Sequence, residues 1–478
     1  MTRAPEGPRR RGRPTGGPAA PPVANRRERP TRARRVALRV LDRVERNGAY
    51  ADLALHGALR QEDMHAGDRA LATELVYGTL RWRGRLDYLL GHFVDRPLLD
   101  LEPIVRSLLR VGAYQIVFLD HVPAATAVDQ TVRSARAAGI ERASGLTNAV
   151  LRRLAREHAA VSFPTLEEDP VGHITHALSL PAWLAKTWVE QLGSTEAAAL
   201  ARALNEVPPL TIRTNLQKST AEALVADLRT RFPAIEPAVY APGAFILGHA
   251  GAPGSDPAFR EGRFTVQDEA SQLVVCALDA QPGERALDVC AAPGTKATAL
   301  AEAVGPSGTV LALDRHSRRL GLVGRDARRL GLDWLTARIY DSSQDLAPVA
   351  PARSFDRVLV DAPCSGLGTL RRNPDARWRV EPDQFAGLAS AQLALLERAA
   401  AALRPGGALV YSTCTLSPEE NEAVIRSFLE GGSGFRVAAR ESHPGAVRPL
   451  LDDDGFLRCW PQRHGTDGFF AARLERTS

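Results

Sequence analysis

The sequence predicts a C-terminal α/β domain with a parallel sheet, preceded by an all-α bundle and a small α+β module. Three observations support this prediction. Apolar stretches of strand length alternate with helical stretches from residue 265 onward, which is typical of βαβ units. In residues 34–160, apolar residues instead recur at the spacing of an α-helix. Residues 285–300 read as a strand, a small-residue turn and a helix, an arrangement that presents backbone N–H groups to a cofactor.

Length and cysteine content limit the class of protein. The chain has 478 residues, which at roughly 150 residues per domain predicts about three domains. It contains no apolar run long enough to span a bilayer, and its basic N-terminus lacks the apolar core of a signal peptide. The five cysteines have no C-x-x-C spacing, which argues against a disulfide framework or a zinc site. We therefore expect a cytoplasmic protein that binds neither a membrane nor a metal.

The positive charge of the chain is concentrated at its N-terminus. The net charge is +6, yet residues 1–35 hold eleven arginines and two glutamates, so the remainder of the chain is net acidic. Residues 1–33 are rich in Arg, Pro, Gly and Ala, and we predict that they form a disordered tail. Such a tail could bind a polyphosphate such as RNA, or it could be a solvated segment with little role.

Residues 34–160 are predicted to form a helical bundle. Ala37, Leu41 and Val44 lie on one face of the first expected helix. Proline and glycine separate the segments that follow, as expected between helices. Further helices are expected at 51–59, 68–76, 86–93, 104–116, 127–137 and 146–154. On these observations alone, the region is an all-α accessory domain.

Residues 173–264 are predicted to form a small α+β module, joined to the bundle by a linker at 161–172. Leu210–Thr214 and Ala244–Leu247 read as strands, and Ala221–Leu228 reads as a helix. This alternation fits a ferredoxin-like RNA-binding layer, although the pattern alone establishes only a small α+β unit.

Residues 265–478 are predicted to form a doubly wound parallel sheet. Asp268 is placed to cap a helix that begins at Glu269. Residues 456–460 and 469–474 read as a hairpin that closes the sheet at its edge. The other strands are expected at 286–289, 309–313, 335–339, 357–360 and 408–411.

Acidic residues follow successive predicted strands. Asp288, Asp314 and Asp361 each end a strand, and Asp341 follows another. Open α/β sheets bind ligands outside the carboxyl ends of their strands, so these carboxylates predict a binding site there. Asp314 lies about 20 residues beyond the glycine turn, where a carboxylate accepts hydrogen bonds from ribose hydroxyls.

Two cysteines differ from the others in their position. Cys364 and Cys414 follow neighbouring predicted strands, in loops where nearby cations or helix N-termini favour the thiolate form. Cys276 and Cys290 are expected to be packing residues, and Cys459 is expected in the edge hairpin.

Three motifs resemble those of the S-adenosylmethionine-dependent RNA cytosine-C5 methyltransferases of the RsmB/Sun family, and residues 34–160 resemble the RNA-binding NusB antitermination factor. The NusB-like region includes Gly145-Leu-Thr-Asn-Ala-Val-Leu-Arg-Arg153. The three motifs are Asp288-Val-Cys-Ala-Ala-Pro-Gly-Thr-Lys296, Asp361-Ala-Pro-Cys-Ser-Gly-Leu-Gly-Thr-Leu-Arg-Arg-Asn-Pro-Asp375 and Tyr411-Ser-Thr-Cys-Thr-Leu-Ser-Pro-Glu-Glu-Asn421. Two positions depart from the family pattern: Thr295 stands where glycine is usual, and Tyr340 precedes Asp341 where glycine is common.

The resemblance implies a Rossmann-like methyltransferase domain that uses S-adenosylmethionine and modifies 16S rRNA rather than DNA. It implies that Cys414 is the nucleophile, that Cys364 assists product release, that Asp361 holds the base and that Lys296 supports these groups. The residue chemistry alone leaves the roles of the two cysteines open. The implied cofactor contacts are Cys290, Ala291, Ala292, Pro293, Gly294, Thr295, Lys296, Asp314, Asp341 and Asp361.

A basic segment follows Cys364, and we expect it to contact RNA phosphates and a stacked base. It contains Arg371, Arg372, Arg377, Trp378 and Arg379. The alternative for this segment is a solvated loop with one packed tryptophan. For the whole chain, the alternatives are the same chemistry on tRNA and a non-catalytic RNA-binding or antitermination factor. We expect a monomer whose macromolecular partner is small-subunit rRNA.

Overall fold

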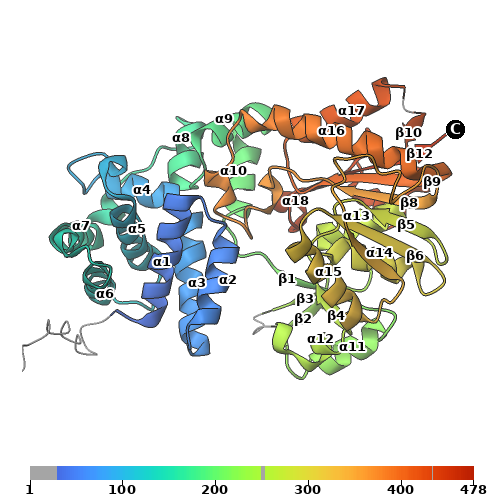
Figure 1. The fold of residues 1–478 in the computed structure, drawn as a ribbon. Helices are drawn as coiled ribbons and strands as arrows, with labels where there is room; N and C mark the ends of the chain where they lie inside the picture. The colour runs from blue at the N-terminus through green and yellow to red at the C-terminus, as the bar shows by residue number, and fades with distance from the viewer. Residues whose placement is uncertain (1–29, 249–252, 433, 478) are drawn as a thin grey trace, which may run out of the picture.

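The computed structural model describes residues 30–248, 253–432 and 434–477, and it has three parts (Figure 1). A helical part lies at one end, a large sheet covered by helices lies at the other, and a small sheet lies below the large one. Across the described ranges, no helix is both long enough and apolar enough to cross a bilayer. Most of the expected N-terminal tail lies outside the described residues.

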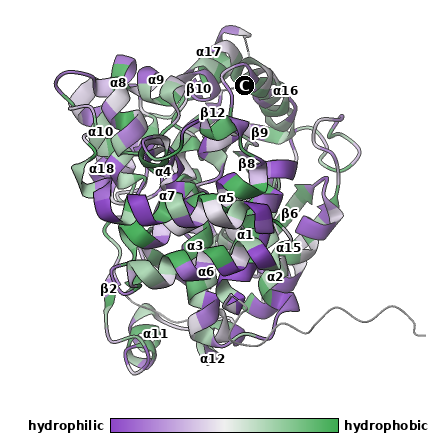
Figure 2. Ribbon diagram, turned by 90° about the vertical axis from the view of Figure 1, so that its left-hand side faces the viewer, coloured by the Kyte–Doolittle hydropathy of each residue, from purple (hydrophilic) through white to green (hydrophobic). Residues whose placement is uncertain are grey.

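Seven helices form the N-terminal part, as predicted. Their apolar faces meet in one core around the largely buried α5, while polar residues lie on the outside of α1, α3, α6 and α7 (Figure 2). The first helix begins at Arg32 and buries Ala33, so the last residues of the expected tail belong to the bundle. The helices are α1 (Arg32–Asn47), α2 (Ala51–Gln61), α3 (Ala66–Arg81), α4 (Arg83–Gly91), α5 (Pro103–Phe118), α6 (Ala124–Ala137) and α7 (Ser144–Glu157).

The expected linker at 161–172 is packed rather than extended through solvent. Val161 and Phe163 pack against the bundle, and the Phe163 ring stacks on Tyr88 with the ring centroids 5.0 Å apart. Three further helices then lead toward the sheets. They are α8 (Pro170–Gly172), α9 (Ala182–Leu192) and α10 (Ser194–Ala203).

The small sheet contains the two strands and the helix that the sequence predicts between residues 210 and 247. Its strand order is β2-β3-β1-β4, and all its pairings are antiparallel. The sequence did not reveal β2 and β4, which are only three residues long each and so are too short to show a strand pattern. The elements are β1 (Leu210–Thr214), α11 (Ala221–Leu228), β2 (Ile235–Pro237), β3 (Ala244–Leu247), α12 (Pro257–Arg260) and β4 (Phe264–Val266).

The large sheet is mixed rather than wholly parallel. Its order is β10-β12-β9-β8-β5-β6-β7, with β11 paired to β12. The five strands from β9 to β7 are parallel, as predicted, whereas β12 runs antiparallel to β9 and β10. The expected hairpin is confirmed in the pairing of β11 with β12, but β12 is not an edge strand because β10 lies beyond it. The strands are β5 (Arg285–Asp288), β6 (Thr309–Asp314), β7 (Leu335–Ile339), β8 (Phe355–Asp361), β9 (Leu403–Thr413), β10 (Phe435–Val437), β11 (Leu457–Cys459) and β12 (Phe469–Arg476).

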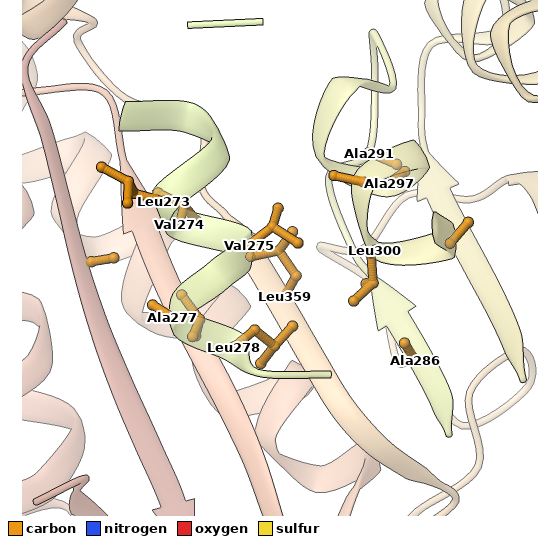
Figure 3. Close-up of a cluster of buried hydrophobic side chains, with 14 of the residues drawn as sticks. Leu273, Val274, Val275, Ala277, Leu278, Ala286, Ala291, Ala297, Leu300 and Leu359 are labelled. Carbon is orange, nitrogen blue, oxygen red and sulfur yellow. The ribbon is translucent and has the colours of Figure 1, made fainter. Parts of the chain in front are cut away.

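Helices cover both faces of the large sheet, as expected for a doubly wound fold. On one face, Leu273 and Leu278 of α13 and Leu300 of α14 pack in the same buried cluster as Leu359 of β8 (Figure 3). Asp268 caps α13 as predicted, because its Oδ1 accepts a hydrogen bond from the Ala270 N–H at 2.9 Å. The helices of this part are α13 (Glu269–Leu278), α14 (Thr295–Val304), α15 (Ser317–Leu330), α16 (Gln384–Ala402), α17 (Glu422–Glu430) and α18 (Pro461–His464).

Candidate active site

The carboxyl ends of the five parallel strands lie along one edge of the large sheet. Asp288, Asp314 and Asp361 are the last residues of β5, β6 and β8, and Cys414 directly follows β9. The strand register pairs Asp288 with Leu359 and Asp361 with Ser412, so these ends are neighbours across the sheet. The structure therefore brings together the side chains that the sequence placed at separate strand ends.

The turn between β5 and α14 is held against the neighbouring strands. The Val289 N–H donates to the Leu359 carbonyl at 3.1 Å, and the Ala291 N–H donates to the Leu313 carbonyl at 2.9 Å. Gly294 has φ +117°, and a Cβ there would lie 3.0 Å from the Val323 Cα atom. The turn therefore requires glycine at 294, both for its backbone conformation and for the approach of α15.

Asp288 is a buried carboxylate with an unused oxygen. Its Oδ1 accepts a hydrogen bond from the Cys290 N–H at 3.2 Å, while its Oδ2 is buried and has no hydrogen-bond partner among the described residues. Burial and then the nearby Asp361 charge raise the pKa of Asp288 to about 7. A ligand donor at this edge could satisfy the free oxygen.

Asp314 and Asp341 present two more acceptors next to the turn. The Asp314 carboxylate accepts from the Ala292 N–H at 3.3 Å and from the His316 N–H at 2.8 Å. Hydrogen bonds from Ser343 hold the pKa of Asp341 below its usual range. Ser342, in the segment that departs from the family pattern, donates to the Val289 carbonyl at 2.7 Å and so joins the loop after β7 to the turn after β5.

Three of the five cysteines lie outside the loops that carry Cys364 and Cys414. Cys459 is fully buried in β11, whereas Cys276 and Cys290 are half-buried and pack against the apolar clusters around the sheet. Burial raises the pKa of the Cys290 and Cys276 thiols, so both stay protonated near neutral pH. Cys290 therefore contributes to the turn through its backbone and its size rather than as a thiolate.

Lys296 and Asp361 form an ion pair beside the cysteines. The Lys296 Nζ atom lies 2.8 Å from Asp361 Oδ2, and the Ser412 hydroxyl donates to Asp361 Oδ1 at 3.0 Å. The Lys296 ammonium also lies 4.9 Å from the centroid of the Phe469 ring. Burial lowers the pKa of Lys296, but the charges of Asp361, Cys414 and Asp288 outweigh it, so the net shift is upward and the side chain is an ammonium.

The two loop cysteines are in contact. Their Sγ atoms lie 3.5 Å apart, and both residues are half-buried. The hydrogen bond with Cys414, together with burial, raises the pKa of Cys364 well above that of a free thiol. Two thiols this close cannot both ionise easily, because the second thiolate would face the charge of the first. The pair is therefore suited to one thiolate and one thiol.

Hydrogen bonds fix the two cysteine loops to each other and to α16. The Ser365 and Thr415 hydroxyls lie 2.6 Å apart. Glu420 accepts from the Ser365 N–H and from Gln392 Nε2, each at 2.9 Å, and Gln392 Nε2 also donates to the Pro363 carbonyl at 2.9 Å. Glu420 lies in the third motif, but no pattern around it in the sequence predicted this role. Gln392 lies within an Ala- and Leu-rich helix, and nothing in the sequence predicted that it would support the cysteine loops.

The prediction that the basic segment after Cys364 contacts RNA is wrong for Arg371 and Arg377. Arg371 and Arg377 are only 2% and 0% exposed. The Arg377 guanidinium donates to the carbonyls of Arg81 and Ser179 at 3.1 Å each, and to Asn205 Oδ1 at 2.8 Å. Carbonyls at the ends of helices lack partners within the helix, and a buried guanidinium supplies several donors at once.

The rest of this segment also joins the helical part to the large sheet. Trp378 Nε1 donates to the Leu80 carbonyl at 2.8 Å, and the Arg379 guanidinium lies 4.0 Å from the centroid of the Tyr50 ring. Arg372 lies 2.9 Å from Asp268, a residue that also caps α13. We call residues 371–379 the joint, since their partners come from the bundle, from the segment directly after α10 and from the loop before β12.

Comparison with known families agrees with the three motifs. The family described as 16S rRNA methyltransferase RsmB/F matches residues 275–475. The NusB family matches residues 31–156, and the ferredoxin-like domain of RsmF/B-like methyltransferases matches residues 180–252. The three matches follow the order of the helical part, the small sheet and the large sheet.

Related proteins match nearly the whole chain. Ribosomal RNA small subunit methyltransferase B of Thermus thermophilus is 38% identical over 449 residues, with 93% of this chain and 98% of that protein covered. The protein of that name from Pseudomonas putida is 34% identical over 449 residues, with 92% and 98% covered. The crystal structure of PH0851 superposes with a TM-score of 0.77 and 27% identity, and covers 92% of this chain and 98% of that one.

Proposed function

Because the chain belongs to the 16S rRNA methyltransferase RsmB/F family, we propose that it transfers a methyl group from S-adenosylmethionine to C5 of a cytosine in small-subunit rRNA. The observation that carries the C5 assignment is the pair of thiols with Sγ atoms 3.5 Å apart, next to the ion pair of Lys296 and Asp361. Methyl transfer to an exocyclic nitrogen or a ribose oxygen needs no thiol, whereas transfer to C5 does.

The electronic structure of cytosine explains the requirement for a thiol. C5 is a weak nucleophile until a second nucleophile adds at C6, which converts C5 into an enamine carbon. We assign this addition to the Cys414 thiolate: its sulfur forms a bond to C6 while the ring gains electron density at C5. After methyl transfer, loss of the C5 proton restores the ring and breaks the sulfur–C6 bond, which releases Cys414.

Asp361 and Lys296 are proposed to position and activate the cytosine ring. Asp361 holds the base edge and favours a proton on N3, which makes C6 more electrophilic toward the thiolate. Lys296 keeps Asp361 in place across 2.8 Å, and its positive charge also stabilises the Cys414 thiolate. The Ser412 hydroxyl fixes the other Asp361 oxygen, so the carboxylate has a defined orientation before RNA binds.

Cys364 is proposed to act after methyl transfer. Its raised pKa keeps it a thiol while Cys414 is the thiolate, so it remains neutral during the addition. Once the Cys414 sulfur is bonded to C6 it carries no charge, so the neighbouring Cys364 can release its proton to solvent, accept the proton from C5 and become a thiol again as Cys414 leaves as a thiolate. The hydrogen bonds of Gln392 and Glu420 hold its loop at this position.

The edge next to these groups suits S-adenosylmethionine, which supplies an activated methyl group when bound. Asp288 has a buried acceptor oxygen with no partner in the described ranges, Asp314 ends β6, and Asp341 lies in the loop after β7. We propose that Asp314 accepts from the ribose hydroxyls and that Asp341 lies near the adenine. The residues proposed to line the methyl donor are Cys290, Ala291, Ala292, Pro293, Gly294, Thr295, Lys296 and Asp361.

The remaining parts of the chain are proposed to bind the RNA. We assign residues 34–160 and 173–264 to RNA-binding domains and residues 265–478 to the methyltransferase domain. We further propose that the protein acts as a cytoplasmic monomer without a metal ion, and that its substrate is rRNA rather than tRNA. The relatives named for ribosomal RNA support the choice of rRNA.

Release of tritium from C5 tests the proposed reaction directly. The full chain is incubated with labelled S-adenosylmethionine and with 16S rRNA or tRNA transcripts that carry tritium at C5 of cytosine. We expect one tritium released for each methyl group incorporated into 16S rRNA, and neither event with tRNA. Methyl incorporation without tritium release would place the methyl group elsewhere, and no incorporation into either RNA would favour a non-catalytic factor.

A further inference from the structure

A groove lies between α6 and α7 in the helical part. It has a volume of about 520 Å³, and helices α6 and α7, which line it, lie on the side of the molecule that is turned toward the viewer in Figure 2. In Figure 1, α6 and α7 lie at the end of the molecule opposite the large sheet, so the groove is remote from the cysteines. Its lining residues on α6 are Ala124, Ala125, Val128, Asp129, Val132, Arg133 and Arg136, and those on α7 are Asn148, Arg152, Ala155 and Arg156.

Arginines dominate the charge of the groove. Arg133 and Arg136 come from α6 and Arg152 and Arg156 from α7, while Asp129 is the single carboxylate among the lining residues. Arg133 pairs with Asp129 across 2.9 Å. The groove thus carries an excess of positive charge, although residues 36–478 as a whole have a net negative charge.

Arg136, Arg152 and Arg156 of the groove are exposed, and Arg156 pairs with Glu157 across 3.5 Å. Arg152 donates to a neutral group, Asn148 Oδ1, at 3.0 Å, so its positive charge is not neutralised there. Between the two rows of arginines, the buried Val128 and the half-buried Val132 and Ala155 form an apolar floor. Donors on two sides of a shallow apolar channel suit a chain with charged oxygens along its length.

We propose that this groove binds the phosphodiester backbone of rRNA away from the target cytosine. The inference rests on the proposed function, because an rRNA substrate supplies the phosphates. Guanidinium groups bind phosphate oxygens through paired, charge-assisted hydrogen bonds, and an RNA backbone presents such oxygens at regular intervals along the groove. Contacts to the backbone carry no base information, so the groove positions the RNA and adds affinity, whereas selection of the cytosine takes place at the sheet edge.

The test removes two arginines, one from each helix. Arg136→Gln/Arg152→Gln is compared with Arg43→Gln/Arg96→Gln, which removes the same charge from exposed positions elsewhere in the helical part. Binding of a 16S rRNA transcript to the full chain is measured over a range of salt concentrations. Two lost phosphate contacts should reduce the slope of log affinity against log salt by about 1.4 to 1.8, and should weaken binding about tenfold or more at low salt.

Methylation kinetics separate the groove from the catalytic edge. The groove variant should raise the KM for RNA while the methylation rate at saturating RNA stays close to that of the control variant. Thermal unfolding of both variants should match the parent chain, since the replaced side chains are exposed. If the groove variant bound RNA with the same affinity and salt slope as the control variant, the proposal would be overturned. It would also be overturned if the groove variant kept its RNA affinity but lost binding to an acidic protein.

The two proposals fail in different ways. A chain that binds 16S rRNA through the groove but releases no tritium from C5 would refute the proposed reaction and leave the groove as an RNA site. If the parent chain and the groove variant methylate 16S rRNA with the same KM for RNA, only the proposal that the groove binds RNA is refuted.

Discussion

The edge of the large sheet and the joint both contain a buried cation, but the two cations have different partners. Lys296 faces the carboxylate of Asp361, and half-buried thiols lie beside it. Arg377 donates through its Nη atoms to backbone carbonyls and to one side-chain amide. Burial accordingly lowers the pKa of Arg377, whereas the pKa of Lys296 is raised by the negative groups around it.

This difference separates a site from a structural contact. At the sheet edge, polar atoms remain available to a ligand, such as the free oxygen of Asp288 and the two sulfurs. In the joint, the guanidinium groups bind the protein itself and hold the bundle against the large sheet. A basic segment near a reactive cysteine therefore indicates RNA binding only when its side chains lack partners within the fold.

The largest effect on rate is expected at the sheet edge. Asp361→Asn should lower the single-turnover methylation rate about 10²- to 10⁴-fold, because the amide no longer favours a proton on N3. Its unfolding temperature should change little, since the side chain is partly exposed. The matched control is Asp345→Asn, whose exposed carboxylate accepts from the Ala347 N–H at 3.0 Å. A normal rate in Asp361→Asn would remove Asp361 from the mechanism.

The joint should show the opposite pattern, a loss of stability. Arg377→Met removes the hydrogen bonds that the buried Arg377 guanidinium donates to the carbonyls of Arg81, Ser179 and Leu204. We expect a loss of about 3–5 kcal/mol in the free energy of unfolding, measured by denaturant titration. Arg43→Met at an exposed position should change it by less than about 0.5 kcal/mol. A comparable small change in Arg377→Met would contradict the structural role of the joint.

Asp288 predicts a pH dependence of stability. Its native pKa of about 7 exceeds the ordinary value near 3.8, so the native state binds more protons than the unfolded state between these pH values. Stability from this group is therefore complete below about pH 4 and is lost as the pH rises to 7. Asp288→Asn removes the titration, and we expect it to gain up to about 4 kcal/mol over the parent chain between pH 4 and pH 8. A difference in unfolding free energy that does not vary with pH would show that Asp288 titrates normally.

The smallest effect is expected for cofactor affinity. Asp314→Ala removes the proposed acceptor for the ribose hydroxyls, and a charged hydrogen bond contributes about 1.5–3 kcal/mol, or roughly ten- to a hundredfold in Kd. Calorimetry with S-adenosylmethionine measures this change. Asp345→Ala, in the next loop, should bind as the parent chain does. Equal affinities in the two variants would refute the assignment of Asp314.

Regular segments of the fold could be predicted from the sequence because their signals are local. The bounds of β1, α11 and β3 match the prediction to the residue, and Asp268 caps α13 as its position indicated. The place of β12 between β9 and β10 depends on pairing across distant segments, which no local pattern records. Three-residue strands such as β4 were missed for the same reason.

The candidate site could be assembled from strand ends, but its supporting contacts could not. The motifs predicted that Cys364 and Cys414 follow adjacent strands, and the register of β8 and β9 confirms this geometry. Gln392 supports both loops from the middle of α16, and nothing in the surrounding sequence distinguishes it from a surface glutamine. The burial of Arg377 could not be predicted either, because all but one of its hydrogen-bond partners lie more than 170 residues away in the sequence.

The roles of the two cysteines are the central claim, and a denaturing gel of the protein–RNA adduct tests it most directly. The full chain and its variants are incubated with labelled 16S rRNA and S-adenosylmethionine, then denatured. Cys276→Ala serves as the control, since Cys276 is half-buried and lies outside the reactive pair. The control should turn over normally and leave no stable adduct.

Cys364→Ala should accumulate a covalent adduct that survives denaturation, because Cys414 can add to C6 and the release step is lost. Cys414→Ala should abolish turnover and form no adduct, and the double variant should form none either. An adduct with Cys414→Ala but not with Cys364→Ala would contradict the account and reverse the two roles. Absence of an adduct in every variant, with only mild losses of activity, would mean that the two thiols are packing residues.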